Sequence, residues 1–225
     1  MIDFTIKSKA DLIEAIDEFG FLPFFENSVS GFSIEEHISP ECWDQGDGSW
    51  DAWEWKGPVI RETGCAYGKF FEKKACYISA RWFPELANYR RDGYDFDARF
   101  DDGLAAYRDK RLYELVADNA PVISKKLKEL GDYRKGGTKG FDTVMNRLQA
   151  QCYVITSDFV YMKDKHGKPY GWGVAEYSTP EKFMGKEFSE KVYRCPPAES
   201  YERILRHFEK LFPAARTETL KKFIK

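Results

Sequence analysis

The feature that most limits how this chain can fold is the order of the sequence patterns between residues 104 and 178. Each pattern is short and ends at a turn or a break. In chain order they are two helices, a glycine-rich segment, a third helix and a β-hairpin, at 104–116, 124–130, 131–140, 141–151 and 159–177. Helices followed by a hairpin in this order predict a winged-helix-like module, which we place at 104–178.

The segments on either side of this module contain both helical and extended patterns. Ser8 and Gly20 bound a first helical pattern, because serine favours a helix start and glycine a helix end. Further helices are predicted at 84–91, 198–212 and 217–224, short strands at 59–60 and 75–79, and an acidic loop at 92–102. We therefore expect an α+β fold with an acidic, aromatic-rich, mixed N-terminal region at 1–103. C-terminal helices at 179–225 are expected to pack on the core.

Positive charge is concentrated in the module. Residues 124–170 contain ten Lys or Arg and five Asp or Glu, a net charge of +5. The first sixty residues contain three Lys or Arg and thirteen Asp or Glu, a net charge of −10, although the whole chain carries only −2. Neutralised phosphates supply most of the non-specific affinity for nucleic acids, so this segregation favours a polyanion partner. We expect that partner to be double-stranded DNA.

Composition narrows the class of protein. The chain is 43% hydrophobic and 16% aromatic, which is typical of a compact folded protein. No apolar run approaches the roughly 20 residues that span a bilayer, so no membrane partner is expected. The five cysteines and three histidines lack metal-ligand spacing, which predicts reduced thiols in a cytoplasmic protein, no metal and no cofactor. The oligomeric state is left open.

The helix predicted at 141–151 has two distinct faces. At about 100° per residue, one face carries the apolar side chains, at Phe141, Val144, Met145, Leu148 and Cys152. The other carries Thr143 and Asn146, with Arg147 beside them, which are groups that can reach base edges and phosphates. The nearby cations extend this candidate DNA-binding surface; they are Arg134, Lys135 and Lys139 before the helix and Lys163, Lys165 and Lys168 at the hairpin. The alternative is a solvated charged face on an ordinary helix–hairpin unit.

A second candidate site is aromatic. Residues 50–56 alternate tryptophan with charge, as a half-buried strand does. Trp53, Glu54, Trp55 and Arg90 could form a pocket for a flipped base, with Glu54 as general base. The alternative is a core strand with a surface ion pair between Glu54 and Lys56. Arg90 and Arg91 could bind phosphate, or could pair with the aspartates that follow them.

Several longer motifs resemble a known family. They are WEWKGP at 53–58, CAYGKFF at 65–71, WFPELANYRRDGYDFDARFDDG at 82–103, YRKGGTKGFDTVMNRLQAQ at 133–151 and YGWGV at 170–174. Together they resemble the small bacterial AlkZ-related proteins, which are distantly similar to the AlkZ/YcaQ winged-helix DNA glycosylases. This resemblance implies DNA binding through winged helices and excision of alkylated bases.

The resemblance also implies a catalytic Gln-x-Gln or Gln-x-Asp motif near the N-terminus. This chain has Gln149-Ala150-Gln151 instead, at the end of the predicted helix, and Gln45 is the only earlier glutamine. Residues two apart on a helix point about 200° away from each other, so both glutamines cannot address one nucleotide. We expect Gln149 at the surface and Gln151 beside the core, and no catalytic residue is assigned.

Three functions follow as hypotheses. The first is a DNA-binding winged-helix protein linked to DNA repair. The second is a DNA glycosylase that excises alkylated bases in the aromatic pocket. The third is a non-catalytic winged helix that binds another protein, and here the acidic N-terminal region could also fold over the basic module.

Overall fold

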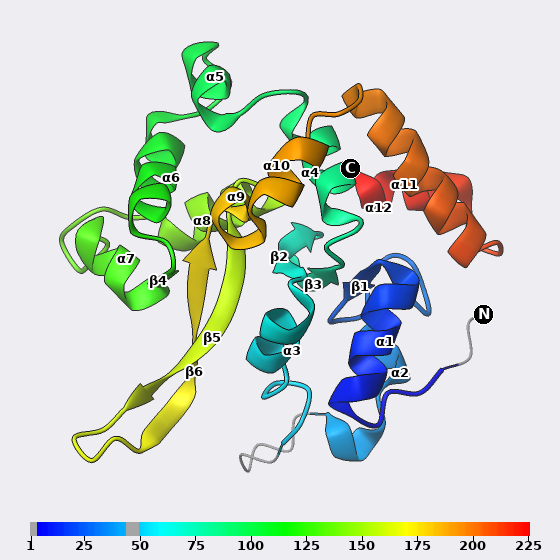
Figure 1. Cartoon of the computed structure of the whole chain (residues 1–225), viewed down its shortest axis with the longest axis horizontal. Helices are drawn as coiled ribbons and strands as arrows, with labels where there is room; N and C mark the ends of the chain where they lie inside the picture. The colour runs from blue at the N-terminus through cyan, green and yellow to red at the C-terminus, as the bar shows by residue number, and fades with distance from the viewer. Residues whose placement is uncertain (1–3, 44–49) are drawn as a thin grey trace.

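The computed structural model describes residues 4–43 and 50–225 (Figure 1). Its centre is one six-stranded sheet with the strand order β1-β3-β2-β5-β6-β4, in which every neighbouring pair is antiparallel. The strands are β1 Phe21–Pro23, β2 Ala66–Phe71, β3 Lys74–Ile78, β4 Val122–Ile123, β5 Ile155–Lys163 and β6 Pro169–Ser178. The predicted α+β class is confirmed.

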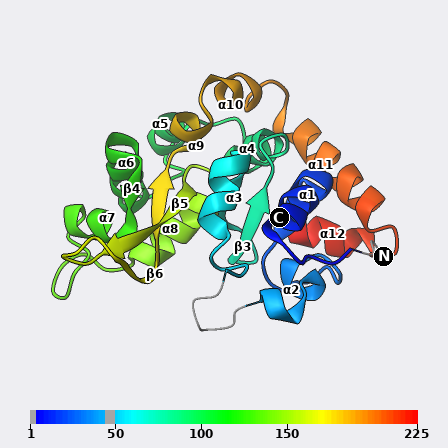
Figure 2. The same cartoon turned by 60° about the horizontal axis from the view of Figure 1, so that its bottom comes forward.

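Helices surround the sheet at both ends (Figure 2). Those of the first hundred residues are α1 Lys9–Phe19, α2 Ile34–His37, the 3-10 helix η1 Pro40–Cys42, α3 Lys56–Thr63, α4 Phe83–Arg91 and α5 Phe96–Asp101. The central ones are α6 Tyr107–Asn119, α7 Ser124–Leu130 and α8 Phe141–Ala150. The C-terminal ones are α9 Pro180–Met184, α10 Lys186–Lys191, α11 Pro197–Leu211 and α12 Thr217–Ile224.

The segment from α6 to β6 follows the order helix, strand, helix, helix, strand, strand. The short strand β4 pairs with β6, and β6 pairs with β5, so the three strands form one edge of the sheet. The sheet does not end there, because Tyr67 of β2 pairs with Thr156 of β5. Strand β5 therefore joins this segment to the N-terminal strands. Beyond the sheet, the β5–β6 hairpin extends away from the body, at the lower left of Figure 1.

Three clusters of buried apolar side chains form the core. One lies under α6, α7 and α8 and includes Leu112, Leu127 and Leu148. A second joins α1 and α3 to the N-terminal strands, and a third lies between the sheet and the C-terminal helices α11 and α12. The C-terminal helices thus pack on the same sheet as the N-terminal strands.

Helix α8 has the two faces that its sequence predicts. Phe141, Val144, Met145 and Leu148 are buried, whereas Thr143 is exposed and Asn146 is partly exposed. The prediction for Gln149 was wrong, whereas Gln151 is partly buried, as expected for a residue beside the core. Gln149 is buried: its Nε2 donates to Thr156 Oγ1 at 3.2 Å, and its Oε1 accepts from the Lys69 amide at 3.1 Å. Gln149 faces the sheet because α8 packs on β2 at this point.

Other local predictions were also wrong. Residues 51–55 form turns rather than a strand, and Val59 and Ile60 lie in α3. The predicted acidic loop contains α5, whose start is capped by Asp95, since its Oδ1 accepts from the Ala98 amide at 2.8 Å. Gln45 lies outside the described residues. Among the helices that the structure describes, none is long and apolar enough to span a membrane.

Candidate nucleic-acid interface and aromatic cavity

The loop between α7 and α8 presents three of the predicted cations. Arg134, Lys135 and Lys139 are all exposed. The loop is compact, because the Asp132 carbonyl accepts from the Thr138 amide at 2.8 Å and the Arg134 carbonyl accepts from the Gly137 amide at 2.9 Å. Arg134 also forms an ion pair with Asp132. The two lysines form no ion pair with any carboxylate of residues 4–43 and 50–225.

Arg147 is differently placed from the other cations. Its guanidinium forms a bidentate ion pair with Asp109 of α6, with Nε 2.7 Å from Oδ2. The Asp109 side chain is 4% exposed and that of Arg147 is 42% exposed. The hydrogen bonds that Arg147 donates to Asp109 raise the pKa of its guanidinium. Arg147 therefore fixes α8 against α6 while one side of its guanidinium still meets solvent.

The tip of the β5–β6 hairpin carries the second group of predicted cations. Lys163, Lys165 and Lys168 are exposed, and none pairs with a carboxylate of the described chain. Asp164 orders the turn instead, because its Oδ1 accepts the amides of His166 and Lys168 at 2.8 and 2.9 Å. The tip is therefore a shaped turn with its ammonium groups in solvent.

Sequence reasoning missed two exposed aromatic side chains on this hairpin. Trp172 is 68% exposed and Tyr170 is 55% exposed, both on β6. Large exposed rings beside unpaired lysines are suited to contact with sugars or bases. The alternation of aromatic residues with glycine in YGWGV was the available signal, since glycine leaves neighbouring rings uncovered.

A cavity of about 510 Å³ lies between α3 and β5. Its lining includes two of the four predicted pocket residues, Trp53 and Glu54, together with Trp50, Arg61, Asp158 and Tyr161. Gly57 permits this geometry: a Cβ at that position would lie 2.6 Å from Asp158 Oδ1. Arg61, Asp158 and Tyr161 were not identified from the sequence. Asp158 and Tyr161 reach the cavity only through the packing of β5 on α3, whereas Arg61 lies on α3 itself.

Two hydrogen-bonded pairs set the polar chemistry of this cavity. The Tyr161 hydroxyl donates to Glu54 Oε2, and Arg61 forms an ion pair with Asp158. Burial and the hydrogen bond to Glu54 raise the pKa of the Tyr161 hydroxyl. Lys56 lies 4.3 Å from the centre of the Trp53 ring. The cavity thus combines aromatic walls with two carboxylates, each of which has a donor.

The other two predicted pocket residues lie elsewhere. Trp55 is 2% exposed and belongs to the core cluster under α1 and α3. Arg90 donates from Nη2 to the carbonyls of Ile224 at 2.8 Å and Phe70 at 3.3 Å, so it holds α12 against β2.

Arg91 is also structural, and its predicted pairing with the following aspartates was wrong. It pairs with Glu181 at 2.6 Å and donates to the Cys152 carbonyl at 2.8 Å. The five cysteines are free thiols. Within the described ranges, no group of three or more His, Cys, Asp or Glu side chains could hold a metal ion.

The fold and the site define an α+β protein whose sheet extends into a basic, aromatic hairpin beside a polar–aromatic cavity. The chain belongs to the AlkZ-related family, whose model matches residues 6–225. Comparison with curated proteins and with solved structures gives no significant match.

Proposed function

We propose that this protein binds double-stranded DNA through a winged-helix module and that it acts in DNA repair. One observation carries the proposal: five exposed lysines at the α7–α8 loop and the hairpin tip lack a carboxylate partner among the described residues. They are Lys135, Lys139, Lys163, Lys165 and Lys168. Unpaired ammonium groups on exposed projections are what phosphate contact requires. Membership of the AlkZ-related family supports the link to repair.

The topology supports the winged-helix part of the proposal. In a winged helix, a short strand after the first helix pairs with the last strand of the hairpin. Here β4 follows α6 and pairs with β6, with α7 and α8 between them in sequence. The apolar cluster under α6, α7 and α8 draws most of its side chains from 104–178, and Phe96 and Phe100 of α5 complete it.

In the proposed complex, the exposed face of α8 enters the major groove. Thr143 and Asn146 supply short hydrogen-bonding groups for base edges, and the α7–α8 loop lies along one strand. The hairpin contacts the backbone or the minor groove. We propose that Arg147 mainly positions α8, because Asp109 occupies two of its donors.

The test is a charge reversal at the hairpin. Lys163→Glu, Lys165→Glu and Lys168→Glu are combined in one variant, and duplex affinity is measured at two or more salt concentrations. We expect affinity to fall by at least about tenfold at low salt, and the dependence on salt to become shallower, because fewer counterions are released.

A matched variant controls for net charge. Lys73, Lys186 and Lys222 are exposed residues outside the module, and their reversal to Glu changes the total charge by the same amount. The control is expected to keep most of its affinity and its salt slope. Equal losses in the two variants, or no loss at the hairpin, would contradict the proposed interface.

A second candidate function is excision of alkylated bases in the cavity between α3 and β5. The observation that favours it is that Trp53 and Glu54 line a cavity of about 510 Å³ whose other wall is the strand leading to the hairpin. An aromatic wall can stack on an extruded base, and a carboxylate can orient an attacking water.

Release of free base from an alkylated duplex tests this function. If the chain is a glycosylase, Glu54→Gln lowers the single-turnover rate by about 10²-fold or more, since it removes a general base but keeps the side-chain size. Glu62→Gln, at the far end of α3 and outside the cavity lining, serves as the control. No release by the unaltered chain leaves DNA binding as the function.

A further inference from the structure

A second large cavity lies at the opposite end of the molecule from the hairpin. Its volume is about 650 Å³, and it is bounded by the start of α4, the end of α10 and one face of α11. In Figures 1 and 2, α11 lies at one end of the molecule, whereas β5 and β6 lie at the other. The proposed function does not use this region, which we name the α4–α11 cavity.

The α4–α11 cavity is lined by a strong excess of positive charge. Six of its lining residues are Lys or Arg, and Glu85 is the single carboxylate among them. The six are Arg81, Lys191, Arg194, Arg203, Arg206 and Lys210. Lys191 pairs with Glu187 and Arg203 pairs with Glu85 and Glu199. The remaining four form no ion pair with the carboxylates that the structure describes, so their charge is not balanced locally.

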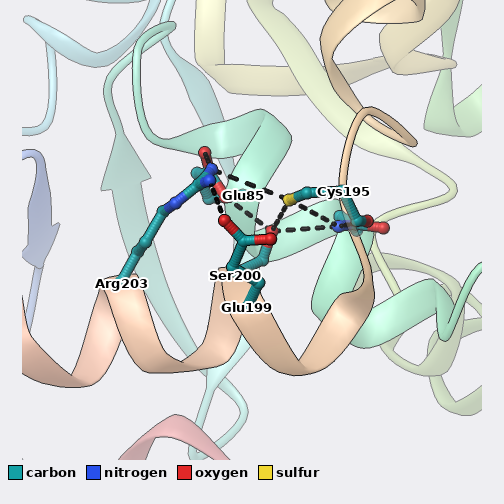
Figure 3. A network of polar contacts seen from close by, with 6 residues as sticks. Glu85, Cys195, Glu199, Ser200 and Arg203 are labelled. Atoms are coloured by element: carbon teal, nitrogen blue, oxygen red, sulfur yellow. Dashed lines mark hydrogen bonds and ion pairs between the residues drawn. The ribbon is translucent and has the colours of Figure 1, made fainter.

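A hydrogen-bonded network fixes one wall of the cavity (Figure 3). Arg203 donates from Nη1 to Glu85 Oε1 at 2.8 Å, and the Ser200 hydroxyl donates to the other oxygen of the same carboxylate. Asn88 in turn donates to Ser200 Oγ at 2.9 Å and to the Cys195 carbonyl at 2.8 Å. Glu85 is therefore fully engaged by α11 and leaves the other cations available to a ligand.

Another part of the cavity lining is aromatic. Trp82 and His207 are stacked with their ring centres 4.2 Å apart. The His207 Nε2–H donates to the Phe19 carbonyl at 2.7 Å, which fixes the imidazole plane, and burial lowers the pKa of this histidine. Gly20 makes room for the indole, since a Cβ there would lie 2.2 Å from Trp82 Cδ1. A flat, ordered ring pair thus borders the cationic cavity.

We infer that the α4–α11 cavity binds the phosphate monoester of a nucleotide. A phosphate monoester carries nearly two negative charges at neutral pH and three acceptor oxygens, so it matches several unpaired cations better than a singly charged phosphodiester does. The Trp82–His207 pair offers a surface for the attached base. The same chemistry occurs in a free mononucleotide and at the 5′-phosphorylated end of a DNA strand.

The test uses the full chain and measures heat or intrinsic fluorescence on titration with adenosine 5′-monophosphate. Adenosine is the parallel probe. We expect saturable binding of the monophosphate and at least tenfold weaker binding of the nucleoside. The variant Arg206→Ala with Lys210→Ala should lower the affinity for the monophosphate by about tenfold or more, because two charge-assisted contacts are lost. Both side chains are exposed, so the fold should be retained.

Lys186→Ala provides the matched control, because Lys186 lies on α10 but outside the cavity lining. Two oligonucleotides of one sequence, with and without a 5′-phosphate, separate the two sources. They are titrated into the hairpin charge-reversal variant, so that duplex-type contacts do not mask the result. Preference for the phosphorylated end identifies strand termini, whereas binding of the mononucleotide alone identifies a free nucleotide.

Either of those preferences supports the inference. It is overturned if neither phosphate-bearing probe binds, if adenosine binds as well as its monophosphate, or if affinity survives Arg206→Ala with Lys210→Ala. The mononucleotide titrations and the Arg206→Ala with Lys210→Ala variant do not involve the hairpin, so loss of one proposal leaves the other standing.

Discussion

Asp109 and Arg147 form an ion pair that joins α6 to α8. The helical wheel places Arg147 on the polar side of α8, and the structure agrees. Its partner lies 38 residues earlier in α6, and helical periodicity carries no information about contacts between helices. A buried carboxylate needs a cation to offset its desolvation, so the pair has a structural role whatever α8 contacts.

Removal of this cation is expected to destabilise the protein. Arg147→Ala leaves Asp109 buried without its partner, and we expect the free energy of unfolding to fall by about 2 kcal/mol. This figure is smaller than that for a fully buried ion pair, because solvent reaches Arg147. Urea unfolding followed by circular dichroism measures the loss. Thr143→Ala, on the exposed side of the same helix, should change stability by less than about 0.5 kcal/mol. Equal midpoints for the two variants would show that the ion pair contributes nothing.

At the scale of helices and strands, sequence signals contained within a few neighbouring residues predicted the local structure correctly. Ser8 caps α1, since its side chain accepts from the Asp11 amide, and Gly20 ends the helix. The apolar face of α8 and the hairpin turn at 164–168 were also evident from periodicity and turn residues. Such signals involve neighbours within about four residues, where sequence alone fixes the geometry.

The wrong predictions have physical reasons too. Alternating tryptophan and charge suggested a strand near 53–56, yet the Asp51 carboxylate accepts the amides of Trp53 and Glu54 and forms a turn that leads into α3. The acid-rich segment before α6 read as a loop, although Asp95 followed by Phe96 was a usable signal for the start of a helix.

Only part of the candidate site could be predicted from the sequence. Lysines on loops were predicted exposed, and the structure places them so. Trp53, Glu54 and Arg61 line a cavity from one stretch of the chain, but Asp158 and Tyr161 come to them from β5, which only the packed fold places beside α3. A site whose residues come from different strands and helices cannot be located before the packing of those elements is known.

At the scale of the whole molecule, the acidic N-terminal region is part of the core. Ile6, Leu12, Phe19 and Phe24 are buried, and β1 forms one edge of the sheet. A region that contributes a strand and an apolar cluster is not a detachable cover for the basic module.

Because the N-terminal region is part of the core, we expect its removal to disrupt the fold. Removal of residues 1–60 deletes β1, α1 and most of α3, and exposes much of the apolar cluster beneath them. We expect the remaining chain to lose its cooperative thermal transition, as measured by circular dichroism and calorimetry. A truncated protein that still unfolds cooperatively near the original temperature would show that residues 61–225 fold on their own.

Strand β5 has a consequence for how the two proposed DNA-related sites communicate. Its first residues, Ile155, Thr156 and Ser157, are buried in the sheet, and its last, Lys163, is exposed at the hairpin. The middle of the strand forms the wall of the aromatic cavity. We expect a polyanion that orders the hairpin also to restrict the conformations open to that wall. Binding at one site would then favour binding at the other by the same factor in both directions.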